Sequence, residues 1–262
     1  MNNTETRRAV DIAARAGTLL LRSGSDITRV EDTIKHIMRS FGVKKYDIFT
    51  ITNGIFLSAS SDEAPDGSCD YTRICEVPKN SSDLYKVDLV NTLSRDIEAG
   101  KCDMDEAEKR LDDMERSKPY YKPVLSLAAA AVASGAFSWL FGGSPVDAAL
   151  AAVIGFSYYY LFILLDKTKL SKLLTNAICG CILALMTVGF VKLIPGVNMD
   201  KVIIGAIMPL IPGVSFVNSV RDIAAGDYIS GAIRMIDAVV VASGIAVGVG
   251  ATIAVFSGFG VI

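Results

Sequence analysis

Five long stretches of this sequence contain no Asp, Glu, Lys or Arg, although the first 122 residues are densely charged. Each stretch exceeds the roughly 17 residues that a helix needs to cross hydrocarbon, and each is too long and too continuously apolar for a barrel strand. The sequence therefore predicts a membrane protein with a multi-span α-helical bundle of five transmembrane helices over residues 121–262, preceded by a separate domain over residues 1–120. The stretches are Pro123–Val146, Ala148–Leu165, Leu173–Val191, Val202–Val220 and Ala238–Ile262.

Histidine and cysteine are too scarce and too scattered to predict a metal centre. There is one histidine, His36, and the five cysteines form no CxxC pair and no metal-ligand spacing. GxSxG, SxxK, phosphate-loop and HExxH motifs are also absent from the sequence. We therefore expect no metal, no cofactor and no catalytic residue, and the nearly balanced net charge gives no reason to expect a nucleic acid. We interpret the cysteines as free thiols in a reducing compartment and as small packing residues: Cys69, Cys75, Cys102, Cys179 and Cys181.

Positive charge is scarce in alternate connections between the apolar stretches, and this pattern predicts the orientation. Phe141–Pro145 and the C-terminus carry no Lys or Arg, and the connection after the third stretch has only Lys192 and Lys201. The other connections hold Arg110, Arg116, Lys118, Lys122, Lys167, Lys169, Lys172 and Arg221. We expect the protein to lie in the cell (inner) membrane. The first domain is expected in the cytoplasm and the C-terminus outside. Charged residues interrupt Thr4–Leu21, so no cleavable signal peptide is predicted.

The first 120 residues predict a cytoplasmic α+β domain in the order helix-helix-sheet-helix-helix. Ser25 or Asp26 can cap the second helix, and Asn53-Gly54 is the dipeptide that best supplies a tight hairpin turn. The expected elements are a helix ending at Ser23-Gly24, a helix from Ile27 to Phe41, strands Tyr46–Thr52, Ile55–Ser60 and Tyr71–Val77, a loop Asp62–Asp70, and helices Asp83–Ile97 and Asp103–Glu115.

Two prolines and a glycine interrupt the fourth apolar stretch. Pro209, Pro212 and Gly213 remove helix hydrogen bonds where lipid cannot replace them. Interrupted helices line binding cavities in many transporters, where freed carbonyls and half-helix N-termini face the solute. We therefore expect these three residues to form a substrate-lining break, with Ser215 and Asn218 donating hydrogen bonds to a carboxylate. A Pro-kinked packing helix is the alternative.

Charged residues between the fourth and fifth stretches are further candidates. Arg234 and Asp237 are three residues apart on one helix face, and we expect them to pair with each other. A structural ion pair near the interface is one interpretation. In the other, Arg221 or Arg234 is the counter-ion for a substrate carboxylate, and Asp222 or Asp237 couples proton movement. We assign Arg221 to substrate binding, and Asp222, Arg234 and Asp237 to coupling or gating.

These residues resemble two signatures of the threonine/serine exporter family. The N-terminal signature is similar to Ser23-Gly24, Thr28-Arg29-Val30-Glu31-Asp32-Thr33 and Phe41-Gly42. The membrane signature is similar to Met208-Pro209-Leu210-Ile211-Pro212-Gly213-Val214, Asn218, Arg221-Asp222, Gly226-Asp227, Ser230-Gly231 and Arg234. Together the two signatures span most of the chain, in the order that the family has.

The resemblance implies an exporter of small amino acids, or of dicarboxylates such as succinate, that runs on an ion gradient, most simply of protons. The chain is similar in particular to the larger subunit of split two-component exporters such as the succinate exporter. The resemblance therefore implies a second small membrane subunit with a complementary helix bundle. A homo-oligomer could replace it, since the small-residue faces of the first and fifth stretches permit both. We expect the cytoplasmic domain to dock under the bundle as a gate.

Two other classes of function stay open. A membrane-anchored regulatory or hydrolase-like domain needs one anchoring helix, and has no use for buried charges or a double-proline break. A channel would differ from a carrier in showing flux without counterflow or saturation, and the sequence does not separate these two.

Overall fold

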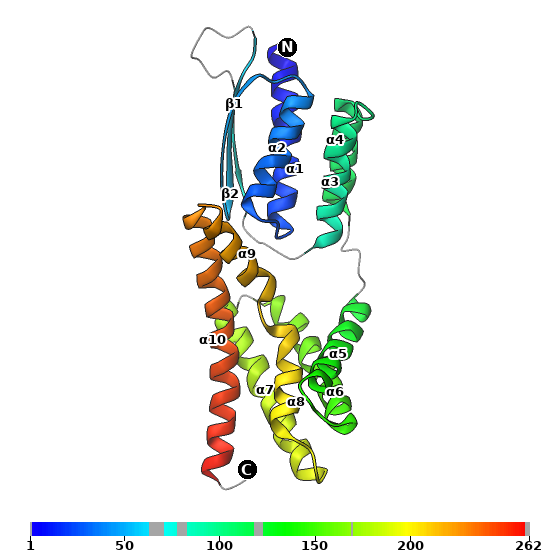
Figure 1. Cartoon of the computed structure of the whole chain (residues 1–262), viewed down its shortest axis with the longest axis vertical. Coiled ribbons are helices and arrows are strands. Elements are labelled where there is room, and N and C mark those ends of the chain that lie inside the picture. Colours follow the sequence, from blue (N-terminus) through cyan, green and yellow to red (C-terminus); the bar gives the residue numbers. More distant parts are fainter. Residues whose placement is uncertain (1, 63–70, 78–82, 118–122, 169, 260–262) are drawn as a thin grey trace. The chain divides into compact units, whose positions relative to one another are not determined.

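The computed structural model of the chain describes residues 2–62, 71–77, 83–117, 123–168 and 170–259 (Figure 1). Cys69 and positions 63–70 of the expected loop lie outside these residues, as do Lys118, Lys122 and Lys169. The elements are α1 (Asn3–Arg22), α2 (Ile27–Ser40), β1 (Lys45–Ile51), β2 (Gly54–Ser60), β3 (Tyr71–Glu76), α3 (Leu84–Glu98), α4 (Met104–Arg116), α5 (Pro123–Leu140), α6 (Pro145–Asp166), α7 (Lys172–Leu193), α8 (Met199–Ile207), the 3-10 turn η1 (Met208–Leu210), α9 (Gly213–Ala224) and α10 (Tyr228–Gly258).

The chain divides into two compact units, which are described separately. The first, here called the α+β unit, contains Met1–Tyr120 together with Val214–Met235. The second, the apolar helical unit, contains Tyr121–Gly213 together with Ile236–Ile262. The two units are therefore not separated by a single boundary at residue 120. Helix α9 and the first turns of α10 pack with the N-terminal residues and belong to the first unit.

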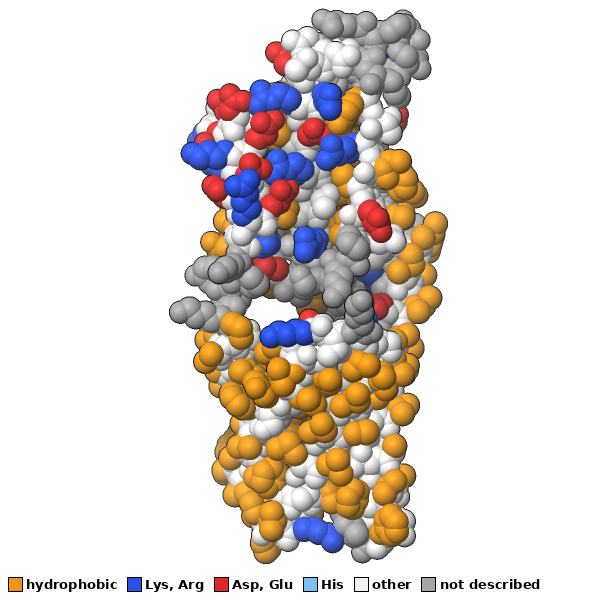
Figure 2. Space-filling model, turned by 180° about the vertical axis from the view of Figure 1, so that it is seen from behind, with side chains coloured by type: hydrophobic (Ala, Val, Ile, Leu, Met, Phe, Trp, Pro, Cys, Tyr) orange, Lys and Arg blue, Asp and Glu red, His pale blue; other side chains and the backbone are white. Residues whose placement is uncertain are grey.

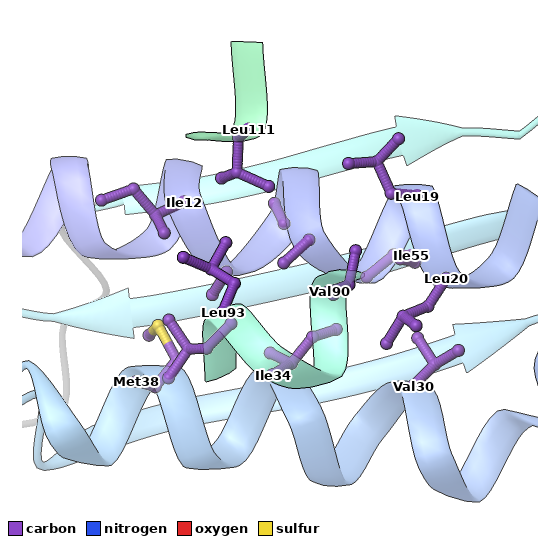
Figure 3. Packing of buried hydrophobic residues seen from close by; sticks show 14 of the residues in the cluster. Ile12, Leu19, Leu20, Val30, Ile34, Met38, Ile55, Val90, Leu93 and Leu111 are labelled. Atoms are coloured by element: carbon purple, nitrogen blue, oxygen red, sulfur yellow. The ribbon is translucent and has the colours of Figure 1, made fainter. Parts of the chain in front are cut away.

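In the α+β unit, α1 and α2 form a layer between a three-stranded antiparallel sheet and the α3–α4 pair (Figure 1). Apolar residues at helical spacing on α1 and α2 supply both faces of this layer. Figure 3 shows how they meet, with Ile55 of β2 on one side and Val90, Leu93 and Leu111 of α3 and α4 on the other. All four side chains are almost completely buried, so the core of the unit lies around the α1–α2 layer.

The β1–β2 hairpin forms as predicted, but its turn lies one residue earlier than expected. Ile51 pairs with Gly54, so Thr52 and Asn53 are the turn residues in place of Asn53-Gly54. This register places Phe49 opposite Phe56, with ring centroids 6.0 Å apart. Cross-strand aromatic pairs stabilise a register. The backbone N–H of Val77 also donates to the Asn53 carbonyl at 2.7 Å and holds the turn.

Ion pairs join α1 to α4 on the surface of the same unit. Arg15 pairs with Asp112 and Glu115 of α4, and Arg8 makes the same kind of pair two turns earlier in both helices. The Arg15 guanidinium, by hydrogen bonding and by its charge, holds the pKa of Asp112 below its ordinary value. A lowered carboxylate pKa contributes stability above the unfolded pKa, and that contribution is lost as the pH falls. The contribution of the Arg15–Asp112 pair is therefore lost in acid.

The apolar helical unit has the surface expected of a protein in lipid. Figure 2 shows Lys, Arg, Asp and Glu side chains gathered over the α+β unit, whereas hydrophobic side chains cover the apolar helical unit. By length and composition, α5, α6, α7 and α10 can each cross a membrane within the described part of the chain. The pair formed by α8 and α9 is bent at a short break, and makes a fifth crossing only if it is counted as one span.

The expected fourth span, Val202–Val220, is therefore two short helices in place of one. Helix α8 ends at Ile207, Pro209 lies in the 3-10 turn η1, and α9 begins at Gly213 after Pro212. A 12-residue helix such as α9 is about 18 Å long, which is too short to cross about 30 Å of hydrocarbon alone. The 31 residues of α10, in contrast, exceed the roughly 20 that a crossing needs. The first two turns of α10 are therefore not needed for a crossing, and they pack with the N-terminal residues of the α+β unit.

Helices α7 and α10 touch backbone to backbone through small residues. A Cβ atom on Gly248 would lie 2.1 Å from the Ala177 carbonyl oxygen, and one on Gly244 would lie 2.6 Å from that of Leu173. Gly244 and Gly248 are four residues apart, which is the spacing of close helix contacts in membranes. The small-residue face of the fifth stretch is therefore used inside this chain.

Replacing Gly248 by Val should destabilise the apolar helical unit, because the new side chain meets the backbone of α7. We expect a loss of about 1–3 kcal/mol, seen as a lower apparent melting temperature in detergent. Gly250→Val is the matched control, since a Cβ there meets nothing within 4 Å. Equal melting temperatures for the two variants would contradict the α7–α10 contact.

Candidate functional site

The turn between α1 and α2 is closed by backbone hydrogen bonds to the end of α1. Gly24 takes a positive φ of 86°, and the N–H groups of Gly24 and Ser25 donate back to Leu21 and Leu20 of α1. This is the pattern in which a glycine ends a helix in the left-handed region. Asp26 then begins α2, because its side chain accepts from the Arg29 N–H at 2.9 Å.

A hairpin of α9 and the start of α10 packs against this turn. Gly226 takes a positive φ of 95° between the two helices, and the Asp227 N–H donates to the Asp222 carbonyl at 2.9 Å. A Cβ on Gly231 would lie 2.9 Å from the Ser219 carbonyl oxygen, so the two helices lie very close together. The hairpin therefore presents its polar side chains as one surface.

Among the described residues, five hydrogen bonds join the hairpin to the N-terminal residues, one of them from Arg221 to Asp26. Asn218 Nδ2 donates to the Gly24 carbonyl at 2.9 Å, and Arg234 Nη2 donates to the Ser25 carbonyl at 2.7 Å. The N–H of Ile27, the first residue of α2, donates to Asp222 Oδ1 at 3.3 Å. Thr52 of the β1–β2 turn donates to the Ser230 carbonyl at 3.2 Å. We call this set of contacts the polar junction.

Charged side chains are buried at the centre of the polar junction. Arg234 Nε lies 3.2 Å from Asp222 Oδ2, and these side chains are 7% and 0% exposed. Asp26, also 7% exposed, has Arg221 Nη1 at 3.4 Å and Arg29 Nε at 3.6 Å. Taking each such charge out of water costs several kcal/mol, which an ion pair offsets only when its geometry is good.

The Arg234–Asp222 pair does not have good geometry. Its Nε and Oδ2 atoms are close enough to attract, yet neither makes a hydrogen bond to any residue that the structure describes. The same holds for the Ser25 hydroxyl, which is also buried. A buried polar atom without a partner costs about 1–3 kcal/mol. In native proteins such groups are explained by strain, by a functional role, or by a water or ion bound there.

The structure brings together four of the nine residues that the sequence singled out. Asn218, Arg221, Asp222 and Arg234 all contact the α1–α2 turn or the start of α2. Pro209, Pro212 and Gly213 lie at the break between α8 and α9, outside the polar junction. Ser215 lies on α9 and is half-buried.

The expected pairing of Arg234 with Asp237 is wrong. Asp237 pairs with Lys172 of α7, with both carboxylate oxygens 2.7 Å from Nζ, and Arg234 pairs with Asp222. The three-residue spacing made the local pair possible, but each side chain has a partner from another helix. Such partners, 65 and 12 residues away in sequence, are not visible in a local pattern.

Sequence reasoning missed the role of Asp26 and of the Gly24 and Ser25 carbonyls. Asp26 was interpreted only as a helix cap, whereas it also pairs with Arg221, 195 residues further along the chain. One signal in the sequence could have indicated this contact: the two distant stretches both resemble signatures of the same family. Within the described residues, no group of three or more His, Cys, Asp or Glu side chains is placed to hold a metal ion.

The apolar helices and the α+β unit indicate the class of protein to which this chain belongs. It is a multi-span membrane protein with an α+β unit. A family model described as "Putative threonine/serine exporter" matches residues 11–256, and the chain belongs to this family.

Two curated relatives match at low identity. The chain is 25% identical over 252 residues to a "Probable threonine/serine exporter" of Mycobacterium tuberculosis, and 24% identical over 255 residues to a "Threonine/serine exporter" of Corynebacterium glutamicum. These matches cover 95% of this chain but 46% and 51% of the relatives. The chain thus spans about half the length of the curated relatives it matches. No solved structure gives a significant match.

Removing one partner of the buried pair should destabilise the protein far more than removing both. Arg234→Met or Asp222→Leu alone leaves an uncompensated buried charge, which costs about 3–5 kcal/mol. The double variant should recover most of this loss, measured as apparent melting temperature in detergent.

The more exposed Lys172–Asp237 pair provides the control for that cycle. Its side chains are 65% and 44% exposed, so Lys172→Met and Asp237→Leu should each cost about 1 kcal/mol or less. Additive losses for Asp222 and Arg234, with no recovery in the double variant, would contradict the pair.

Proposed function

We propose that this chain is a subunit of a secondary transporter that exports small carboxylate metabolites from the cytoplasm. Threonine and serine are the first candidates, because both curated relatives carry the name threonine/serine exporter. Dicarboxylates such as succinate are the second candidates, on the resemblance to split exporters. Membership of an exporter family and the set of apolar helices support transport over a merely anchored domain.

The observation that carries this proposal is the polar junction. Both stretches that resemble family signatures contribute to it: Gly24 comes from the first, and Asn218 and Arg234 come from the second. A protein that used its helices only as an anchor would have no need to bury charges between two such segments. We therefore propose that the N-terminal part of the α+β unit acts on α9 and the start of α10 as a gate on the cytoplasmic side.

In this proposal the candidate residues fall into two groups. Asn218 and Arg221 bind the substrate carboxylate once they leave Gly24 and Asp26, and Asp222 and Arg234 open and close the gate. The break at Pro209, Pro212 and Gly213, with Ser215 beyond it, lines the path and allows α9 to move. Asp237, paired with Lys172, is the remaining candidate for coupling to a proton gradient.

The proposed transporter includes a partner for this chain. Because the chain spans about half the length of its relatives, we propose a complementary helix bundle supplied by a second small membrane subunit or by another copy of this chain. The assembly lies in the lipid bilayer of the inner membrane with the α+β unit in the cytoplasm and residue 262 outside, as the distribution of Lys and Arg predicts.

Efflux from proteoliposomes tests the proposed function. Vesicles loaded with labelled threonine, serine or succinate should show saturable efflux that depends on a pH gradient. The chain is reconstituted alone and with a candidate small multi-span subunit, and protein-free vesicles are the control. Saturable efflux would identify the substrate, and the comparison would show whether a second subunit is required. Absence of flux for all three solutes would contradict the proposal, and non-saturable flux would indicate a channel.

A further inference from the structure

Two carboxylates lie at the N-terminus of α2, although one capping side chain is enough to begin a helix. Asp26, at the cap position, already accepts from the Arg29 N–H. Asp222 comes from α9 and places a second carboxylate against the Ile27 N–H, at 3.3 Å. Free N–H groups and the helix dipole make such a terminus a binding place for anions. Here the anion is a side chain from a segment 195 residues away.

Cationic groups lie beside both carboxylates, Asp222 and Asp26. Arg234 lies beside Asp222 with its side chain 7% exposed, while Arg221 and Arg29 lie beside Asp26. Guanidinium groups bind carboxylates best through two parallel hydrogen bonds. A buried arginine at a helix N-terminus is therefore suited to a small organic carboxylate.

Asp222 occupies the N-terminus of α2 without satisfying all the polar atoms around it. Its Oδ2 and the Nε of Arg234 make no hydrogen bond to a described residue although they are 3.2 Å apart. The buried Ser25 hydroxyl, one residue before the α2 cap, also has no partner among the described residues. A free carboxylate is not tied to α9 and can align with Arg234. It would then also have the Ser25 hydroxyl as a donor.

We propose that Asp222 is an internal competitor that occupies the carboxylate-binding place at the N-terminus of α2. A small organic carboxylate displaces it, binds the Ile27 N–H and Arg234, and frees α9 from the start of α2. The contact of Asn218 with Gly24, which also comes from α9, then loosens with it. This inference rests on the proposed export of carboxylates and names the place where the solute is first recognised.

Binding to variants of the full-length chain in detergent tests the competition. Threonine and succinate are titrated by calorimetry, with the methyl esters of both as probes that lack the charged carboxylates. Asp222→Asn keeps the shape but removes the competing charge, so carboxylate affinity should rise about tenfold or more. Arg234→Met should lower it by about tenfold or more, because a charge-assisted hydrogen bond is lost.

Asp200→Asn is the control, since Asp200 is an exposed acidic residue in the first turn of another helix, α8. It should leave affinity unchanged, and the methyl esters should not bind. Weaker carboxylate binding by Asp222→Asn than by the unsubstituted chain would overturn the inference. Equal binding of the esters would overturn it as well.

Hydrogen exchange on the unsubstituted chain covers the case in which a variant fails to fold. Saturating threonine or succinate should speed exchange in α9 while the Ile27 amide stays protected. Unchanged exchange in α9 under saturating carboxylate would overturn the competition. Binding and exchange as expected, without efflux from vesicles, would instead contradict the proposed export and leave the binding place standing.

Discussion

The arrangement of the α+β unit depends on the burial of Asp222 and Arg234 against the start of α2. Their side chains are 0% and 7% exposed, and they meet residues that precede them by about 200 positions. Hydrophobic residues of similar size would stabilise such a contact as well or better, since buried ion pairs barely offset the cost of removing charges from water. The pair is therefore better explained by specificity. It fixes which turn of α9 and α10 faces the α1–α2 turn.

The lengths of the neighbouring helices are consistent with that contact. Helix α9 is too short to cross a membrane alone, while α10 is longer than one crossing requires. The short helix and the surplus turns form the hairpin that carries Asn218, Asp222 and Arg234 to the polar junction. The proline break before α9 frees this hairpin from a continuous span, because it ends the hydrogen-bond ladder of α8.

Much of the fold could be predicted because its signals are local. Charge-free runs, the glycine after α1, the cap at Asp26 and the prolines after α8 each act within a few residues. The turn at Thr52 and Asn53 was missed by one position because the Phe49–Phe56 pair outweighs the preference of Asn53-Gly54. The polar junction could not be predicted from spacing. Its partners are set by how α9 and α10 pack, and the local Arg234–Asp237 pattern pointed to the wrong pair.

A distance measurement inside the α+β unit tests the central claim most directly. Thr28 of α2 and Ala225 after α9 are exposed, so Thr28→Cys and Ala225→Cys can carry spin labels in a chain whose own cysteines have been replaced. Pulsed electron resonance should give one narrow distance distribution, which broadens when Asp222→Ala is added. A broad distribution in the chain with Asp222 intact, or a narrow one that Asp222→Ala leaves unchanged, would contradict the claim that this carboxylate holds α9 against the start of α2.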